Sequence, residues 1–131
     1  MLNILLVDDE LALREALRLV LCDGGHTVDV APDAEVAIER LATRPFDLVV
    51  SDVRLPKVDG LTLLHRIRRD FPSTEVLLMT AYGSIGDAAT AVNDSAVDYL
   101  RKPIDINHFV AVVARIEERR RSRDEHAVSL T

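Results

Sequence analysis

Short runs of apolar residues alternate along the chain with segments in which apolar residues recur three and four positions apart. The short runs predict β-strands at residues 3–7, 27–31, 47–51, 75–79 and 97–100. The segments between and after them predict amphipathic helices around residues 13–21, 34–41, 63–67, 85–92 and 106–116. This (βα)5 alternation predicts an α/β domain with a parallel sheet and helices on both faces.

Polar residues and glycines mark the ends of several predicted helices. Asp33 and Asp105 are candidate N-caps, and Ser84 and Asp87 have the spacing of a capping box. The Gly-Gly pair at 24–25 is expected to end the first helix. These signals agree with the boundaries that the apolar pattern predicts.

The predicted strands differ in how continuously apolar they are. The runs ILLV at 4–7, LVV at 48–50 and VLLM at 76–79 are typical of strands that are covered on both faces. TVDVA at 27–31 and VDYL at 97–100 carry polar residues and are expected at the edges. The compatible arrangement is the flavodoxin-like doubly wound sheet with strand order 2-1-3-4-5, which binds ligands beyond the carboxyl ends of strands one and three.

Acidic residues gather at that position. Asp8 and Asp9 close the first strand and Asp52 closes the third, so we expect their carboxylates to converge. Carboxylates this close raise one another's pKa unless a cation neutralises them. Hard oxygen ligands without nearby His or Cys favour Mg²⁺ over zinc or copper. The alternative is that such acids are solvated loop residues or helix caps, an interpretation that we keep for Glu10.

Two further strand ends carry the complementary groups. Thr80 supplies a hydroxyl at the end of the fourth strand, and Lys102 supplies an ammonium after the fifth. Only two of the 16 basic residues are lysines, Lys57 and Lys102, so the ammonium at position 102 indicates a specific requirement for lysine there. Acids, hydroxyl and ammonium around Mg²⁺ predict phosphoryl transfer to a carboxylate, with Asp52 as the nucleophile.

Composition limits the remaining possibilities. The 131 residues are enough for one domain, and 48% hydrophobic residues fit a domain with a compact core. A net charge of −6 argues against direct nucleic-acid or membrane partners, although residues 119–123 are basic. The single Cys22 excludes an internal disulfide framework, and no run resembles a membrane span or a signal peptide. A cytoplasmic location is therefore expected.

Together these motifs resemble the response-regulator receiver domains of bacterial two-component signalling, over about residues 3–118. The resemblance rests on VDD at 7–9, DVRLPKVDG at 52–60, TA at 80–81 and KP at 102–103, with Leu55 in place of the usual Met. It implies that Asp52 accepts a phosphoryl group from a phosphohistidine of a sensor histidine kinase. It also implies that Asp9, Asp52 and the main-chain carbonyl of Arg54 bind Mg²⁺, and that Asp8 acts mostly through water.

The resemblance also predicts how a signal would leave the site. Thr80 would be drawn toward the phosphoryl group, and Tyr99 would swing inward, unless it is simply a half-buried edge aromatic. This would change the face of the fourth helix, fifth strand and fifth helix, which serves homodimerisation in the family. Arg54 and Tyr82 would influence dephosphorylation. The only catalysis expected is the domain's own phosphorylation and slow dephosphorylation, so we do not expect an enzyme.

The stretch TAYGSIGDA at 80–88 further resembles the receivers of enhancer-binding transcription activators. The chain is then either a free-standing receiver or, as we prefer, the input domain of a longer transcriptional regulator. We expect a receiver domain at 1–121 and a charged tail or the start of a linker at 122–131, with the last helix continuing through 115–126. Asp94 and Ser95 replace the apolar residue and glycine usual in relatives and predict a short or mobile fourth helix.

Two other classes of protein could use the same sheet. A flavin- or nucleotide-binding electron carrier would need a glycine-rich phosphate cradle, whereas the first loop here is acidic. A phosphatase with an Asp nucleophile would need a dedicated acid or base and a substrate pocket, and the sequence indicates neither. A receiver that is never phosphorylated is also disfavoured, because all five site residues are present.

Overall fold

A computed structural model of the chain describes residues 1–81 and 98–129. Five parallel strands form one sheet in the order β2-β1-β3-β4-β5, as predicted. The strands are β1 (Asn3–Val7), β2 (Thr27–Ala31), β3 (Leu48–Asp52), β4 (Glu75–Thr80) and β5 (Asp98–Arg101). The third strand begins and ends one residue later than predicted and the fourth extends by one residue, so Asp52 and Thr80 are themselves the last strand residues.

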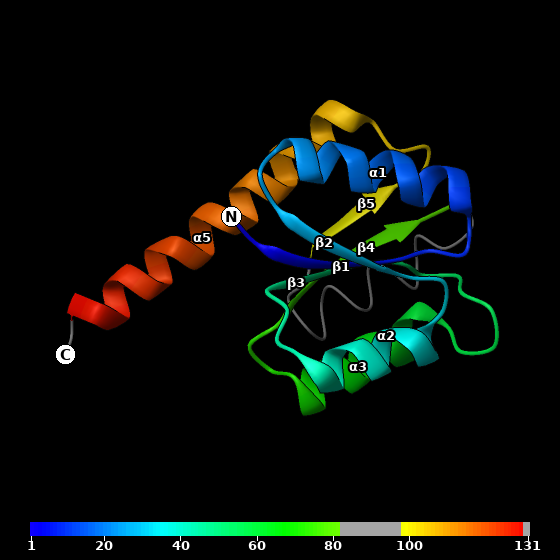
Figure 1. Cartoon of the computed structure of the whole chain (residues 1–131), viewed down its shortest axis with the longest axis horizontal. Helices are drawn as coiled ribbons and strands as arrows, with labels where there is room; N and C mark the ends of the chain where they lie inside the picture. The colour runs from blue at the N-terminus through cyan, green and yellow to red at the C-terminus, as the bar shows by residue number, and fades with distance from the viewer. Residues whose placement is uncertain (82–97, 130–131) are drawn as a thin grey trace.

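Four helices are described, and they cover both faces of the sheet. They are α1 (Leu11–Asp23), α2 (Ala34–Thr43), α3 (Gly60–Asp70) and α5 (Ile106–Ser129). Figure 1 shows α1 and α5 on one face, with α2 and α3 on the other. The fold is therefore the predicted flavodoxin-like one.

The helix ends follow the polar signals of the sequence. Asp33 caps α2 by accepting a hydrogen bond from the amide of Val36 at 2.9 Å, and Asp105 accepts one from the amide of His108 at 3.2 Å. Gly24 ends α1, and Gly25 follows with a φ of 91°. The predictions for the helix at 85–92, its capping box, Tyr82 and the Asp94-Ser95 departure concern residues outside the described ranges.

Two separate cores explain why the central strands are continuously apolar. Leu5 and Val7 pack with α2 and α3, whereas Ile4 and Leu6 pack with α1 and α5. Successive side chains of a strand point to opposite faces, so a strand covered on both faces needs apolar residues throughout. This packing fixes the register of the strands and therefore the relative positions of the residues at their carboxyl ends.

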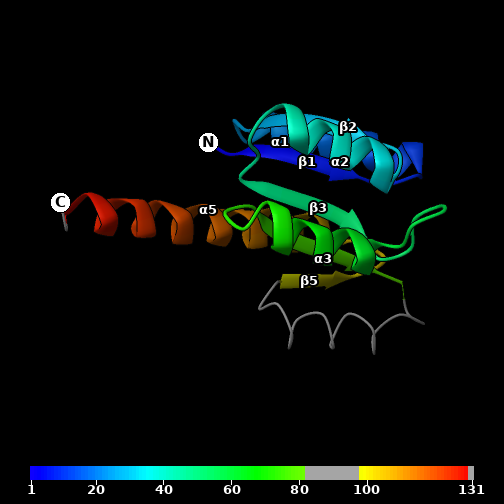
Figure 2. The same cartoon turned by 90° about the horizontal axis from the view of Figure 1, so that it is seen from below.

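The last helix extends well beyond the sheet that it covers. Among the residues whose burial the structure describes, up to 124, Ile116 is the last buried apolar residue of the helix. Figure 2 shows the rest of α5 projecting away from the domain. Arginines 119 and 120 hold the helix where it passes the amino ends of the strands: Arg119 pairs with Glu75 and Asp98, and Arg120 pairs with Asp47 and Glu75. The helix is thus anchored first by apolar contacts and then by ion pairs.

Candidate functional site

Three carboxylates converge at the carboxyl edge of the sheet. Asp8 and Asp9 follow β1, and Asp52 ends the neighbouring strand β3, where Val7 is in register with Ser51. Carboxylate oxygens of the three residues lie within 4.8 Å of one another. Asp8 is fully buried, Asp52 is nearly so, and Asp9 is exposed. The structure therefore brings together the three acids that the sequence placed at this edge.

Lys102 lies among these acids. Its Nζ is 2.5 Å from Oδ2 of Asp52 and 3.5 Å from Oδ2 of Asp8. Its main-chain N–H donates to the carbonyl of Thr80 at 2.7 Å, and the peptide bond to Pro103 is cis. Burial by itself lowers the pKa of Lys102, but the hydrogen bond to Asp52 and the charges of the two acids outweigh it and raise that pKa. The lysine is therefore a fixed positive charge at neutral pH.

The buried carboxylate of Asp8 is only partly satisfied. Its Oδ1 accepts a hydrogen bond from the amide of Glu10 at 2.9 Å. Its Oδ2 is buried and has no hydrogen-bond donor within residues 1–81 and 98–129, although Lys102 lies nearby. Burial raises the pKa of Asp8, because the charged form loses its hydration. An anionic oxygen in this state is one that a cation or its bound water would stabilise.

The charges and donor atoms of the cluster fit Mg²⁺. Three carboxylates and one ammonium leave a net charge of −2, which a divalent cation neutralises. All side-chain donors in the cluster are carboxylate oxygens, the ligands that Mg²⁺ prefers. The unsatisfied oxygen of Asp8 agrees with this interpretation.

Backbone contacts hold Asp52 in place. Its Oδ1 accepts a hydrogen bond from the amide of Arg54 at 2.9 Å, and the amide of Val53 donates to the carbonyl of Met79 at 2.8 Å. The amide of Gly60, at the start of α3, donates to the carbonyl of Val53 at 2.7 Å. The loop after β3 is thus tied to both β4 and α3, which leaves the Asp52 carboxylate little freedom to move.

The other predicted site residues have distinct surroundings. Thr80 is buried, and its hydroxyl donates to the carbonyl of Ala81 at 3.1 Å. Tyr99 lies on the edge strand β5 with 41% of its surface exposed. Arg54 is exposed beside Asp52, and Tyr82 lies outside the described residues. Thr80 and Tyr99 therefore occupy the positions at β4 and β5 from which the predicted switch would start.

Sequence analysis missed Arg14, which reaches the same region from the first turn of α1. Its Nη1 donates to the main-chain carbonyl of Asp8 at 2.9 Å. The residue is half-buried. Its position one turn into the helix that follows the acidic loop was the available signal, because a long side chain there can fold back toward the helix N-terminus.

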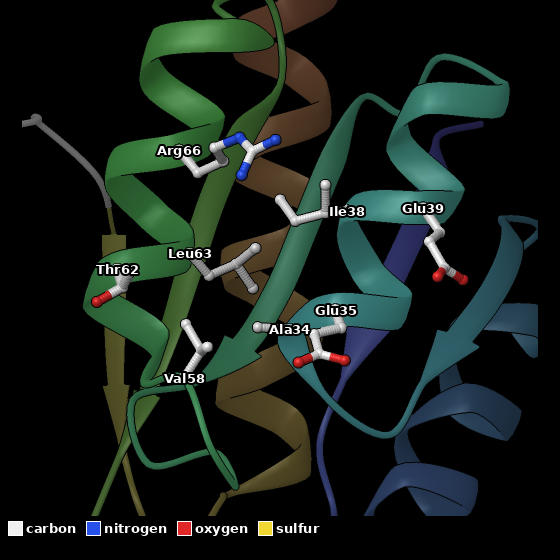
Figure 3. Close-up of a pocket in the computed structure, with 8 residues that line it drawn as sticks. All are labelled: Ala34, Glu35, Ile38, Glu39, Val58, Thr62, Leu63 and Arg66. Atoms are coloured by element: carbon white, nitrogen blue, oxygen red, sulfur yellow. The ribbon is translucent and has the colours of Figure 1, made fainter.

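A hollow between α2 and α3 is separate from the acidic cluster (Figure 3). Its floor is apolar, and charged residues lie at its rim. The lining residues are Ala34, Glu35, Ile38, Glu39, Val58, Thr62, Leu63 and Arg66. None of the acids of the cluster lines this hollow, so it is not part of the site.

Comparison with known proteins identifies the family. The model of the response regulator receiver domain matches residues 4–114. This chain belongs to that family. The receiver domain is a signalling module rather than a classical enzyme: receivers of two-component systems work with sensor histidine kinases and bind Mg²⁺ at an acidic pocket. Among the helices described here, none is long and apolar enough to cross a bilayer.

Similar proteins include longer regulators. The chain is 46% identical over 113 residues to the response regulator protein FleR of Pseudomonas aeruginosa, covering 86% of this chain and 24% of FleR. It is 38% identical over 109 residues to the DNA-binding transcriptional regulator NtrC of Escherichia coli, covering 83% of this chain and 23% of NtrC. The crystal structure of NtrX from Brucella abortus superimposes with a TM-score of 0.89 at 31% identity, covering 96% of this chain and 29% of NtrX. The chain thus spans about a quarter of the length of FleR and of NtrC.

Proposed function

We propose that this receiver domain is a phosphorylation-activated switch in which Asp52 accepts a phosphoryl group from a phosphohistidine of a sensor histidine kinase. The convergence of Asp8, Asp9 and Asp52 with Lys102 is the observation that carries the proposal. A carboxylate that is held by backbone contacts and faces an ammonium can serve as a positioned nucleophile. An electron carrier would need a glycine-rich phosphate cradle in place of this acidic loop, and a phosphatase would need a dedicated acid or base beside the nucleophile.

In the transfer step, an oxygen of Asp52 attacks phosphorus, and the bond from phosphorus to the imidazole nitrogen of the kinase breaks. The imidazole leaves, and the aspartate becomes an acyl phosphate. Lys102 pairs with the negative charge on the transferring group, while the amide of Arg54 keeps the carboxylate oriented.

Mg²⁺ would be held by Asp9, Asp52 and the main-chain carbonyl of Arg54, with Asp8 bound through water. When bound, the ion neutralises charge on the phosphoryl oxygens. Asp8 then contributes a buried negative charge that attracts the ion, and Lys102 keeps the remaining charge of the cluster low.

The response begins at Thr80 and ends at the surface. Phosphorylation adds roughly two negative charges and three acceptor oxygens to Asp52. The hydroxyl of Thr80, which now donates to Ala81, turns toward them, and Tyr99 moves inward from β5. The changed face comprises the fourth helix, β5 and α5, and it controls homodimerisation or an output domain. Exposed Tyr99, Ile106 and Val110 supply apolar surface on β5 and α5 for such an association.

We assign residues 1–121 to the receiver domain and 122–131 to a charged tail or the start of a linker. The unbroken helix α5, which ends at Ser129, supports a stiff connection to whatever it joins. Similarity to the DNA-binding transcriptional regulator NtrC supports a role in transcriptional regulation, with DNA binding carried out by another domain rather than by this one.

A phosphodonor experiment tests the transfer. The chain is incubated with phosphoramidate and Mg²⁺, and its intact mass is measured. Wild type is expected to gain one phosphoryl group, and Asp52→Asn is expected to gain none. Asp23→Asn, which changes an exposed aspartate at the end of α1, serves as the matched control and should be labelled like wild type. Labelling of Asp52→Asn at the wild-type level would overturn the assignment of Asp52.

A second experiment tests the output. Beryllofluoride with Mg²⁺ mimics the acyl phosphate, and sedimentation velocity reports the size of the chain. Wild type is expected to associate on addition of beryllofluoride. Thr80→Ala is expected to bind beryllofluoride but to associate less, because the hydroxyl that responds to the anion is gone. Equal association of the two would remove Thr80 from the switch.

A further inference from the structure

The acidic loop between β1 and α1 is held by a side chain that the proposed function does not use. Asp8 lies just beyond β1, and its amide donates to the carbonyl of Ala31 at 3.2 Å. Its carbonyl accepts the hydrogen bond from Nη1 of Arg14 at 2.9 Å. That carbonyl belongs to the peptide unit that leads into Asp9. Fixing the carbonyl therefore fixes the plane of this peptide and with it the positions of the N and Cα atoms from which the Asp9 side chain extends.

Asp9 depends on this backbone contact more than its neighbours do. The Asp8 carboxylate is held by the amide of Glu10 and by burial, and the Asp52 carboxylate by the amide of Arg54 and by Lys102. Asp9 is exposed, and within the described part of the chain nothing donates a hydrogen bond to its carboxylate. Its position relative to the other acids is therefore set by the backbone of the loop.

We propose that Arg14 is a positioning residue for the Mg²⁺ site: by binding the carbonyl of Asp8, it orients Asp9 toward Asp8 and Asp52. This inference rests on the proposed function, because it assigns Arg14 a role in the same site. Arg14 touches neither the phosphoryl group nor the metal in this role. It acts through the main chain of the loop that carries two of the acids.

Two effects of Arg14 on Mg²⁺ binding have opposite signs. Its positive charge near the acids repels a cation, so removing that charge by itself would tighten binding by a few-fold in a solvent-exposed setting. Its hydrogen bond preorganises the ligands, and loss of a group that orients metal ligands typically weakens binding ten- to a hundredfold. Arg14 is half-buried and its Nη1 bond is charge-assisted, so the orienting effect is the larger.

The Nε atom of Arg14 does not take part in holding the loop. It is buried and has no hydrogen-bond acceptor among the described residues. The side chain thus leaves one donor without a partner in the position in which it binds the carbonyl of Asp8. The hydrogen bond from Nη1 to the carbonyl of Asp8 is therefore the contact through which Arg14 acts on the loop.

The test is a titration of the full chain with MgCl₂, followed by amide NMR shifts near the acidic site. In Arg14→Met, which keeps the apolar stem but removes the donor, the Mg²⁺ concentration at half-saturation is expected to rise about tenfold. Arg14→Gln is too short to reach the carbonyl and should behave in the same way. Arg14→Lys keeps an amine donor and should recover part of the affinity. Arg18→Met, one turn further along α1, removes a pair with Glu15 and should titrate like wild type.

Phosphorylation by phosphoramidate supplies an independent measurement. In Arg14→Met the Mg²⁺ concentration that gives half of the maximal rate should rise by the same factor. The rate at saturating Mg²⁺ should stay within about twofold of wild type, since the reacting groups themselves are intact. A role in stability alone would instead lower the melting temperature and leave the half-saturating Mg²⁺ concentration unchanged.

Several results would overturn the inference. Unchanged or tighter Mg²⁺ binding in Arg14→Met and Arg14→Gln would show that the hydrogen bond does not orient the site. An equal loss in Arg18→Met would show a general effect of charge on α1. Absence of a saturable Mg²⁺ response in wild type would overturn the proposed function and this inference with it, whereas a normal wild-type response with unaffected variants would overturn only the role of Arg14.

Discussion

Substitution of Gly60 by alanine tests the close contact between the start of α3 and the backbone of Asp52 and Val53, which holds the loop after β3. Gly60 is the first residue of α3 and lies directly against the end of β3. A β-carbon built there would overlap the carbonyl oxygen of Asp52 and lie 2.8 Å from the Cα of Val53. Carbon atoms rest at about 3.5–4.0 Å from one another, so the added atom is too close by roughly an ångström. Both obstructing atoms belong to the backbone, so the loop itself has to move.

The expected cost follows from this geometry. Overpacking typically costs about 1–3 kcal/mol, and obstruction by backbone on two sides places Gly60→Ala at the upper end of that range. Alanine recovers up to about 1 kcal/mol through its helix propensity and a less flexible unfolded chain. We therefore expect the free energy of unfolding to fall by about 2 kcal/mol.

Gly25 provides the matched control, because its reason for being glycine is different. Its φ of 91° is unfavourable for any residue with a β-carbon, but nothing lies within 4 Å of the place where that carbon would be. Gly25→Ala should therefore cost only the backbone strain, about 1 kcal/mol. This change is also remote from Asp52, so it should leave phosphorylation unchanged.

Urea denaturation followed by far-UV circular dichroism measures both costs, and labelling by phosphoramidate measures the effect on the site. The expected order of stability is wild type, then Gly25→Ala, then Gly60→Ala, with labelling slowed only in Gly60→Ala. Wild-type stability in Gly60→Ala, or normal labelling despite the loss of stability, would refute the view that this contact positions Asp52.

Two further predictions concern His26, which precedes β2, and Glu75, the first residue of β4. Burial lowers the pKa of His26, whose Nδ1 accepts a hydrogen bond from the amide of Leu2 at 3.0 Å. The unfolded chain then binds the proton more readily, so this contribution to stability is present above about pH 6.5 and is lost as the pH falls. His26→Gln should flatten the decline in unfolding free energy from pH 7.5 to 5, and an unchanged decline would contradict this. Glu75→Gln weakens the pairs with arginines 119 and 120 and should lower the unfolding free energy by about 1–2 kcal/mol, less so in high salt. Glu118→Gln removes an exposed pair with Arg121 and should change the unfolding free energy little. If urea titrations gave equal losses of unfolding free energy for Glu75→Gln and Glu118→Gln, a special role for Glu75 would be refuted.

The strand order and the convergence of the acids were predictable because both follow from the apolar pattern of each strand and from the common direction of parallel strands. Leu5 and Ile4 must face different cores once β1 is central, so continuous apolarity identifies a central strand. The carboxyl ends of parallel strands share one edge of the sheet, so Asp8 and Asp52 meet there although they are far apart in sequence. Local pattern and topology together were sufficient for both.

Contacts made by long side chains could not be predicted in this way. In the sequence, the basic run at 119–123 was weighed only as a contact for nucleic acid or membrane, and the net charge of −6 argued against that role. In the structure, Arg119 and Arg120 instead pair with acids at the amino ends of three strands. Which acid an arginine reaches depends on the angle at which α5 crosses the sheet, and no periodicity in the sequence encodes that angle. The φ of 68° at Lys57, in the loop after β3, was likewise not predicted from the sequence.

Acids cluster at both the carboxyl ends and the amino ends of the strands, but basic side chains neutralise them to different extents. At the carboxyl edge, a single ammonium faces three carboxylates, which leaves negative charge for a divalent cation. At the amino edge, Asp47, Glu75 and Asp98 begin or precede three strands and are matched by arginines of α5. Asp98 directly precedes Tyr99 and pairs with Arg119 at 3.2 Å. In the proposed function Tyr99 moves, so a shift of β5 acts on α5 through this pair. Under this proposal, the signal would pass from the site to α5 through the edge strand β5.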